Sequence, residues 1–156
     1  MRSPQRDDPI ELARFPQPPS EVDLLRIRSG VLHLAAYSAL HRTYASGVLQ
    51  KRIDPALALG QFHYHTDTSG LPAAFCNWVW LSRDVLQAVA TTGRDLDPHE
   101  FRCGELPFFY EFLAPFGHAR AVVRALRDRA EFRGRAIPAI RGRRGDGGPL
   151  IKTFQF

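Results

Sequence analysis

Two apolar runs separated by a short polar turn constrain the fold of this chain more than any other feature. Residues 57–65 and 72–81 are rich in apolar and aromatic side chains, and residues 67–70 (DTSG) lie between them. Short runs of this composition on either side of a turn are typical of an antiparallel β-hairpin. The middle of the chain is therefore expected to form two neighbouring strands of a sheet.

Apolar residues at helical spacing predict helices on both sides of this hairpin. Residues 21–37 repeat apolar side chains every three or four positions after Ser20, a residue type that caps helix N-termini. A second helix is expected over residues 83–91 behind Ser82, and a third over residues 118–130. Two of the three helices thus begin behind a serine cap.

Three further extended segments complete the expected sheet. Residues 106–113, 132–140 and 150–154 have strand-like composition, and residues 145–148 supply a turn between the last two. A leading helix followed by mixed strands and helices predicts an α+β fold, with a mostly antiparallel sheet and flanking helices.

Size and composition indicate one domain. The chain has 156 residues, of which 44% are hydrophobic and 24% charged, near the averages for globular proteins. Residues 1–19 contain five prolines and are expected to form a loose arm, and residues 20–156 a single domain. The sequence has two cysteines, no apolar run of the about 18 residues that a membrane span needs, and no hydrophobic signal stretch, so we expect a cytoplasmic protein.

Arginine dominates the charge of the chain. Lysine and arginine total 21 against 16 acidic residues, which gives a formal net charge of +5, and the only lysines are Lys51 and Lys152. Arginine makes forked contacts with carboxylates and phosphates, so an acidic partner such as nucleic acid, an anionic membrane face or an acidic protein is expected. Arg120, Arg124 and Arg127 fall on one face of the third helix, which is typical of a solvated surface or of a docking face.

Two alternating histidines in the first strand are a candidate metal site. His63 and His65 lie on the same face of that strand, with Cys76 expected across the hairpin. Zinc sites need three or four correctly placed ligands, and no second Cys/His pair has zinc-finger spacing. The sequence therefore favours a solvent-facing histidine pair and no metal.

A histidine and an acid that are remote in sequence form the candidate catalytic pair. His41 follows the first helix, and Glu111 lies in an otherwise aromatic and aliphatic strand. Because strand residues alternate between faces, Glu111 points either to water or into a cleft, where it would orient an imidazole. Residues 114–117 precede a helix and offer free N–H groups for an anion or an oxyanion, but they lack the glycine spacing of nucleotide loops.

Three blocks of sequence resemble the RTX toxin-activating lysine acyltransferases of the hemolysin-activator type. Residues 38–42 (SALHR) and 72–82 (PAAFCNWVWLS) match the patterns S-x-L-H-R and P-x-A-[YF]-C-x-W-x-x-L-S. Residues 109–117 (FYEFLAPFG) follow in the expected order and resemble F-x-D-x-x-A-P-F-G, with Glu111 in place of the aspartate. The resemblance covers roughly residues 31–154. It implies a Gcn5-like acetyltransferase-type fold, a cytoplasmic location and a homodimer.

The same resemblance implies a reaction and its catalytic residues. A fatty acyl group would pass from acyl carrier protein to internal lysines of a pore-forming RTX protoxin, with no bound cofactor. By position, the family's catalytic histidine falls on His41, its catalytic aspartate on Glu111, and a serine implicated in activity on Ser38. Glutamate is one methylene longer than aspartate, and a misplacement of about 1 Å can cost about a hundredfold in rate.

The resemblance also implies where the acyl donor lies. Phe116 and Gly117 are expected beside the thioester, and Arg120 and Arg124 are expected to face the acidic acyl carrier protein. The sequence leaves open whether the acyl group passes directly to the lysine or first to the enzyme, for example to His41.

Two other functions remain open at this point. One is an acyl-coenzyme A-dependent N-acyltransferase of the same fold, which the missing glycine-rich pyrophosphate loop disfavours. The other is a non-catalytic basic module that binds nucleic acid, although the sequence has no aromatic RNA-binding motif or KH loop.

Overall fold

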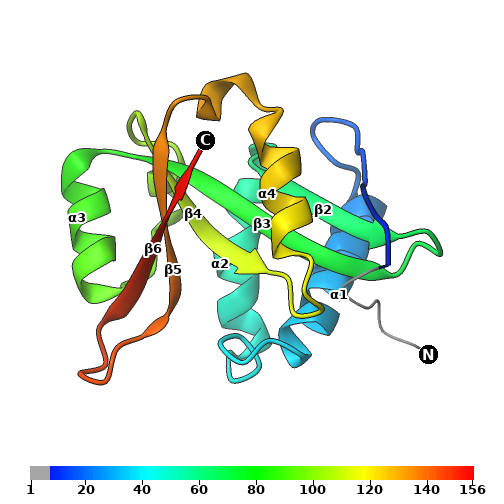
Figure 1. Cartoon of the computed structure of the whole chain (residues 1–156), viewed down its shortest axis with the longest axis horizontal. Coiled ribbons are helices and arrows are strands. Elements are labelled where there is room, and N and C mark those ends of the chain that lie inside the picture. Colours follow the sequence, from blue (N-terminus) through cyan, green and yellow to red (C-terminus); the bar gives the residue numbers. More distant parts are fainter. Residues whose placement is uncertain (1–7) are drawn as a thin grey trace.

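A single six-stranded sheet organises residues 8–156, the part of the chain that the computed structural model describes (Figure 1). The strands are β1 (Ile10–Leu12), β2 (Phe62–Asp67), β3 (Pro72–Leu81), β4 (Leu106–Leu113), β5 (Ala136–Arg143) and β6 (Pro149–Gln155). They follow one another across the sheet in chain order, and all neighbours are antiparallel except β4 and β5. The predicted α+β class with a mostly antiparallel sheet is confirmed.

Helices cover both faces of this sheet. They are α1 (Glu21–Ala36), α2 (Ser46–Ala58), α3 (Arg83–Thr92) and α4 (Ala119–Arg127), with short 3₁₀ turns η1 (Pro98–Phe101) and η2 (Ala130–Phe132). Helices α1, α2 and α3 pack on one face, and α4 packs on the other, where Figure 1 shows it in front of β3. None of the helices described is long and apolar enough to cross a membrane.

The predicted hairpin is confirmed, and an aspartate closes its turn. The carboxylate of Asp67 accepts hydrogen bonds from the backbone N–H groups of Ser69 and Leu71, at 2.8 and 2.9 Å. The first strand of the hairpin, β2, begins at Phe62 and not at the predicted Leu57, because the residues around Leu57 complete helix α2.

Helix α1 forms as its cap and apolar spacing predict. The hydroxyl of Ser20 accepts from the backbone N–H of Asp23 at 3.1 Å, and the Asp23 carboxylate accepts from the Ser20 N–H at 3.2 Å. This reciprocal pair is a capping box. The buried face of the helix includes Gly30, which lies directly against the ring of Tyr64 on β2.

One α-helix and one strand were not predicted. Helix α2 lies in a stretch before residue 57 for which the sequence predicts no element, and strand β1 lies within the segment expected to be a loose arm, where Ile10 pairs with Asp67. The arm expectation is therefore wrong for Ile10–Leu12, because this segment satisfies its backbone groups on the edge of β2. Residues 1–7 of the expected arm lie outside the described residues.

Candidate active site

The structure brings His41, Glu111 and Ser38 into direct contact. The Nε2 atom of His41 lies 2.5 Å from Oε2 of Glu111, although the two residues are 70 positions apart. The Nδ1 atom of His41 lies 2.7 Å from the Ser38 hydroxyl. Only 3% of His41 and 2% of Glu111 is exposed, so the pair is shielded from water.

These contacts assign the protons of the imidazole. The hydroxyl oxygen of Ser38 accepts the backbone N–H of His41 at 3.3 Å, which leaves the hydroxyl proton free to point at Nδ1. Nε2–H then donates to the Glu111 carboxylate. A neutral imidazole in this arrangement carries its proton on Nε2 and its lone pair on Nδ1. The groups are hydrogen-bonded in the same order as those of a serine hydrolase triad: hydroxyl of Ser38, imidazole of His41, carboxylate of Glu111.

A tight turn after α1 positions Ser38 and His41. The backbone N–H of Ser38 donates to Ala35 O at 3.1 Å, and that of Arg42 donates to Ser38 O at 2.9 Å. The ring of Tyr44 packs edge-on against the imidazole, with 5.2 Å between centroids. The SALHR segment is therefore a hydrogen-bonded turn that directs its histidine inward.

A β-bulge positions Glu111. The register of β3 and β4 shifts beside the Asn77–Glu111 pair and leaves Tyr110 as an extra residue in β4. Consecutive strand residues ordinarily face opposite sides, but a bulge re-aims them. Tyr110 and Glu111 consequently both contact Arg52. The side chain of Asn77 accepts the Glu111 N–H at 2.8 Å.

Arg52 on α2 binds the second oxygen of Glu111. Its Nε–H donates to Oε1 of Glu111, and its Nη1 donates to the Asp95 carboxylate and, at 2.9 Å, to the Tyr110 hydroxyl. The guanidinium carbon lies 4.0 Å from the centroid of the Tyr110 ring. The carboxylate is thus held between an imidazole and a guanidinium.

This environment keeps Glu111 ionised. Burial opposes its charge, but the hydrogen bond from His41 and the positive charge of Arg52 hold the pKa of Glu111 below its usual value. Burial equally opposes the charge of Arg52, yet Glu111 holds the pKa of that guanidinium above its usual value. Burial raises the pKa of Tyr110 to about 12, so its hydroxyl stays neutral.

Two pockets are lined by residues that bind Glu111. One, of about 330 Å³, is lined by Tyr37, Ser38, Ala39, Leu40, His41, Phe112, Ala114, Pro115 and Arg141. The other, of about 320 Å³, is lined by Leu40, Tyr44, Val48, Arg52, Gly93, Arg94, Asp95, Ile140, Gly142, Arg143 and Pro149. Residues that bind the two oxygens of Glu111 therefore line two different pockets, which share Leu40.

The residues predicted on the donor side are divided between two places. The ring of Phe116 packs 5.3 Å from that of Tyr37, a wall of the His41 pocket. Gly117, Arg120 and Arg124 line a separate pocket of about 460 Å³ against residues 8–10. The N–H of Gly117 donates to Ala114 O at 3.2 Å and so closes the turn itself.

Arg52 and Asn77 are the site residues that the sequence prediction missed. Arg52 lies on the unpredicted helix α2, where Leu49, Ile53 and Ala56 recur at helical spacing on the buried side. That spacing was the available signal. The sequence around Asn77 contained no such signal, because the side chain of Asn77 has a role only where the bulge brings it beside the Glu111 N–H.

The histidine pair of β2 is buried, so the expectation that it faces solvent is wrong. His63 and His65 are 5% and 2% exposed, and Cys76 pairs with His63 across the hairpin. Burial lowers the pKa of His63 to about 3 and that of His65 to about 4, so both are neutral. Among the described residues these side chains do not gather three ligand atoms within 4.8 Å.

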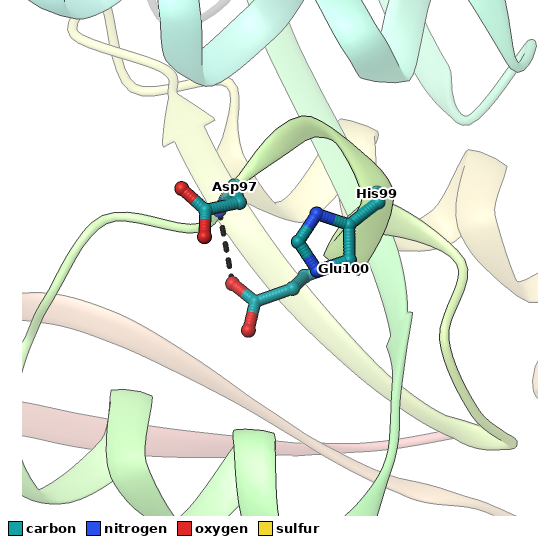
Figure 2. A group of neighbouring side chains, drawn as sticks. All are labelled: Asp97, His99 and Glu100. Carbon is teal, nitrogen blue, oxygen red and sulfur yellow. Dashed lines mark hydrogen bonds between the residues drawn. The ribbon is translucent and has the colours of Figure 1, made fainter.

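One group of possible metal ligands does gather elsewhere in the described chain (Figure 2). Asp97, His99 and Glu100 each bring one ligand atom within 4.8 Å of the others. Both oxygens of Glu100 already accept bonds from Arg94 at 2.9 Å, and one also accepts the Asp97 N–H. The charge of Arg94 opposes a cation there, so we assign no metal to this exposed group.

Comparison with known proteins places these residues in a family context. The model of the RTX toxin acyltransferase family matches residues 21–155. The chain is 36% identical over 130 residues to the lysine-acyltransferase RtxC of Vibrio cholerae serotype O1, which covers 80% of this chain and 85% of RtxC.

More distant relatives carry related names. The leukotoxin-activating lysine-acyltransferase LktC serotype A1 of Mannheimia haemolytica is 26% identical over 89 residues, 57% of this chain and 53% of the relative. The RTX-II toxin-activating lysine-acyltransferase ApxIIC of Actinobacillus pleuropneumoniae is 28% identical over 105 residues, 67% of this chain and 65% of the relative.

Proposed function

We propose that this chain, which belongs to the RTX toxin acyltransferase family, transfers a fatty acyl group from acyl carrier protein to lysine side chains of an RTX protoxin and so activates the toxin. The family and the names of the relatives supply the reaction class. The observation that carries the proposal is the contact of His41 with Glu111 and Ser38 at the edge of a pocket.

The reaction needs a base, which His41 supplies. A lysine amine has a pKa near 10.4 in water, so at neutral pH it is protonated and must lose a proton to become nucleophilic. The ammonium first loses one proton to water, and as the free amine nitrogen then bonds to the thioester carbon, a second proton passes from it to Nδ1 of His41, the nitrogen that carries the lone pair. Ser38, which donates to the same nitrogen, either moves aside or relays this proton. The C–S bond then breaks, and the leaving thiolate takes the proton from the imidazolium.

Glu111 and Arg52 prepare the imidazole for this step. The carboxylate fixes the Nε2–H tautomer and stabilises the positive charge that forms on His41. Arg52 balances the carboxylate while the imidazole is neutral. Because the pair is buried, these charges interact more strongly than they would in water.

Four residues are our candidates for the side of the site that binds the acyl donor. Phe116 and Gly117 stay our candidates for the thioester side. The contact of Phe116 with Tyr37 supports the placement of Phe116, whereas Gly117 lines the separate pocket. Arg120 and Arg124 are exposed on α4 and stay our candidates for docking acyl carrier protein, whose surface is acidic.

Further properties are proposed from the family resemblance. They are a Gcn5-like acetyltransferase-type fold, a cytoplasmic location and a homodimer. The α+β sheet with helices on both faces supports the first. Exposed Val22, Leu25 and Leu32 at helical spacing on α1 support the last, which light scattering would test.

The proposal is tested with purified protein, a fragment of an RTX protoxin and two donors, acyl-acyl carrier protein and acyl-coenzyme A. We expect a mass gain of one acyl group per modified lysine with the carrier-protein donor and little with coenzyme A. Transfer from coenzyme A alone would select the other acyltransferase. No transfer from either donor, together with salt-dependent RNA binding, would select a nucleic-acid-binding module.

A further inference from the structure

We infer that Arg52 is a positioning residue for the acyl transfer: it holds the Glu111 carboxylate in place against His41 and maintains its negative charge. The effect of Arg52 on the reaction rests on the proposed function. The effect of Arg52 on the geometry and charge of Glu111 rests on the contacts alone.

A buried carboxylate needs more than a neutral imidazole to stay charged. Glu111 is almost inaccessible to water, and transferring an unpaired ion out of water is strongly unfavourable. His41 offers one hydrogen bond and carries a positive charge only when its imidazole is protonated. The guanidinium of Arg52 is the full positive charge in direct contact with the carboxylate.

The contacts of Arg52 also fix where the carboxylate lies. One oxygen of Glu111 is bound by His41 and the other by Arg52, so the carboxylate is held from both sides. Arg52 is itself held by the Asp95 carboxylate, by the Tyr110 hydroxyl and over the Tyr110 ring. The side chain of Glu111, which is one methylene longer than that of aspartate, is thereby kept from rotating away from the His41 imidazole.

Asn77 joins the backbones that carry these two side chains. Its amide nitrogen donates to Arg52 O at 3.0 Å, and its amide oxygen accepts the Glu111 N–H at 2.8 Å. Asn77 therefore bridges helix α2 and strand β4 by hydrogen bonds. The two backbone segments that carry the Arg52–Glu111 ion pair are linked through this one side chain.

Several ionisable groups surround the pair. Those with a direct contact or an electrostatic effect on Glu111, Arg52 or Tyr44 are His41 after α1, Tyr44 before α2, Asp95 before η1, Tyr110 on β4 and Arg143 on β5. Of these, Arg143 is exposed and Asp95 is 64% exposed, so solvent screens both. Arg143 is thus a screened cation and Asp95 carries the same negative charge as Glu111, so neither can replace Arg52 as the buried counter-charge.

Two substitutions test the inference. Arg52→Met removes the charge and keeps most of the side-chain volume, whereas Arg52→Lys keeps the charge but loses the forked donors. The control is Arg28→Met, which removes an arginine paired with Asp54 at 2.8 Å between α1 and α2, away from His41.

The first readout is the ¹³C titration of the Glu111 carboxyl, measured without substrate. We expect Arg52→Met to raise the titration midpoint by about 1 to 3 pH units, because the opposite charge has gone, and Arg52→Lys and Arg28→Met to leave it nearly unchanged. An unchanged midpoint in folded Arg52→Met would overturn the inference, whether or not the protein acylates lysine.

The second readout is the turnover number for acyl transfer. We expect losses of about a hundredfold for Arg52→Met and about tenfold for Arg52→Lys, and no loss for Arg28→Met. If Arg52→Met does not fold, Arg52→Lys decides: wild-type turnover in that variant contradicts a positioning role, and a tenfold loss with the midpoint retained supports it.

Discussion

Among single residues, Glu111 shows how the site accommodates an acid one methylene longer than the aspartate that the resemblance implies at this position. The strand that carries it is bulged, its amide is bound by Asn77, and its second oxygen is bound by Arg52. These features bring Oε2 within 2.5 Å of His41 Nε2. The site is therefore built for the length of glutamate.

We predict that Glu111→Asp lowers activity, although aspartate is the residue that the resemblance implies at this position. The shorter acid withdraws from His41, Arg52 or both, and turnover should fall by about ten- to a hundredfold. Steady-state acylation of a protoxin fragment measures the effect, with thermal melting to verify folding. Full activity of Glu111→Asp would contradict the account of the bulge.

Ser38 should contribute less than His41. Ser38→Ala removes the hydroxyl that orients Nδ1 but leaves the base, so we expect a loss of about tenfold to a hundredfold in turnover. Ser46→Ala, on an exposed serine at the start of α2, is the matched control. A loss as large as that of His41→Ala would instead indicate that Ser38 takes part in the chemistry directly.

At the scale of single residues, sequence motifs predicted some of the residues of the candidate active site. His41, Glu111 and Ser38 could be predicted from the order of three short blocks, and the structure brings all three together. Arg52 and Asn77 could not, because their roles come from the ion pair and the bulge, which exist only once α2 and β4 are packed.

Among the elements, α1 and α2 show why one helix was predictable and the other was not. Helix α1 has a capping box and an uninterrupted apolar face. Helix α2 begins without a side-chain cap, contains Pro55 and buries the charged Arg52 on its inner side. The apolar spacing of Leu49, Ile53 and Ala56 was present in α2, but the absent cap, Pro55 and the buried Arg52 made the helix harder to recognise.

Packing should outweigh helix propensity at Gly30 of α1. Alanine is favoured over glycine by about 1 kcal/mol in a helix. A Cβ at this position, however, would lie 2.8 Å from Cζ of Tyr64, and overpacking typically costs about 1–3 kcal/mol. We expect Gly30→Ala to lower the free energy of unfolding, measured by urea denaturation.

Gly47 on α2 provides the control for that substitution. Apart from its chain neighbours and the nearby backbone of its own helix, no atom lies within 4 Å of a Cβ built there, so Gly47→Ala should leave stability unchanged or raise it. Equal effects of the two substitutions would refute the close packing of α1 on β2.

For the whole molecule, the buried histidines predict loss of stability in acid. The folded chain holds the pKa of His63 near 3 and that of His65 near 4, whereas an unfolded histidine titrates near 6.5. Below pH 6.5 the unfolded state therefore binds more protons, and stability falls as pH falls.

Urea denaturation at pH 7, 6 and 5 measures this loss. Two histidines should together lower the free energy of unfolding by about 2 to 4 kcal/mol between pH 7 and pH 5. His63→Leu should roughly halve the slope, while His99→Gln, at an exposed position, should not change it. A flat profile in the wild-type protein would show that these histidines are not buried in solution.

The arrangement of the whole sheet was only partly predictable. Local patterns gave the β2–β3 hairpin and the strand-like character of β4, β5 and β6. The parallel pairing of β4 with β5 and the docking of β1 on β2 depend on contacts between remote segments. No local pattern carries that information.

The rate of lysine acylation by His41→Ala, compared with wild type, tests the central claim most directly. Both proteins are incubated with acyl-acyl carrier protein and a protoxin fragment, and the mass gain on lysine is followed over time. Loss of the base should slow transfer by about a hundred- to ten-thousandfold while the protein stays folded. Transfer at the wild-type rate would contradict the assignment of His41 and, with it, the mechanism.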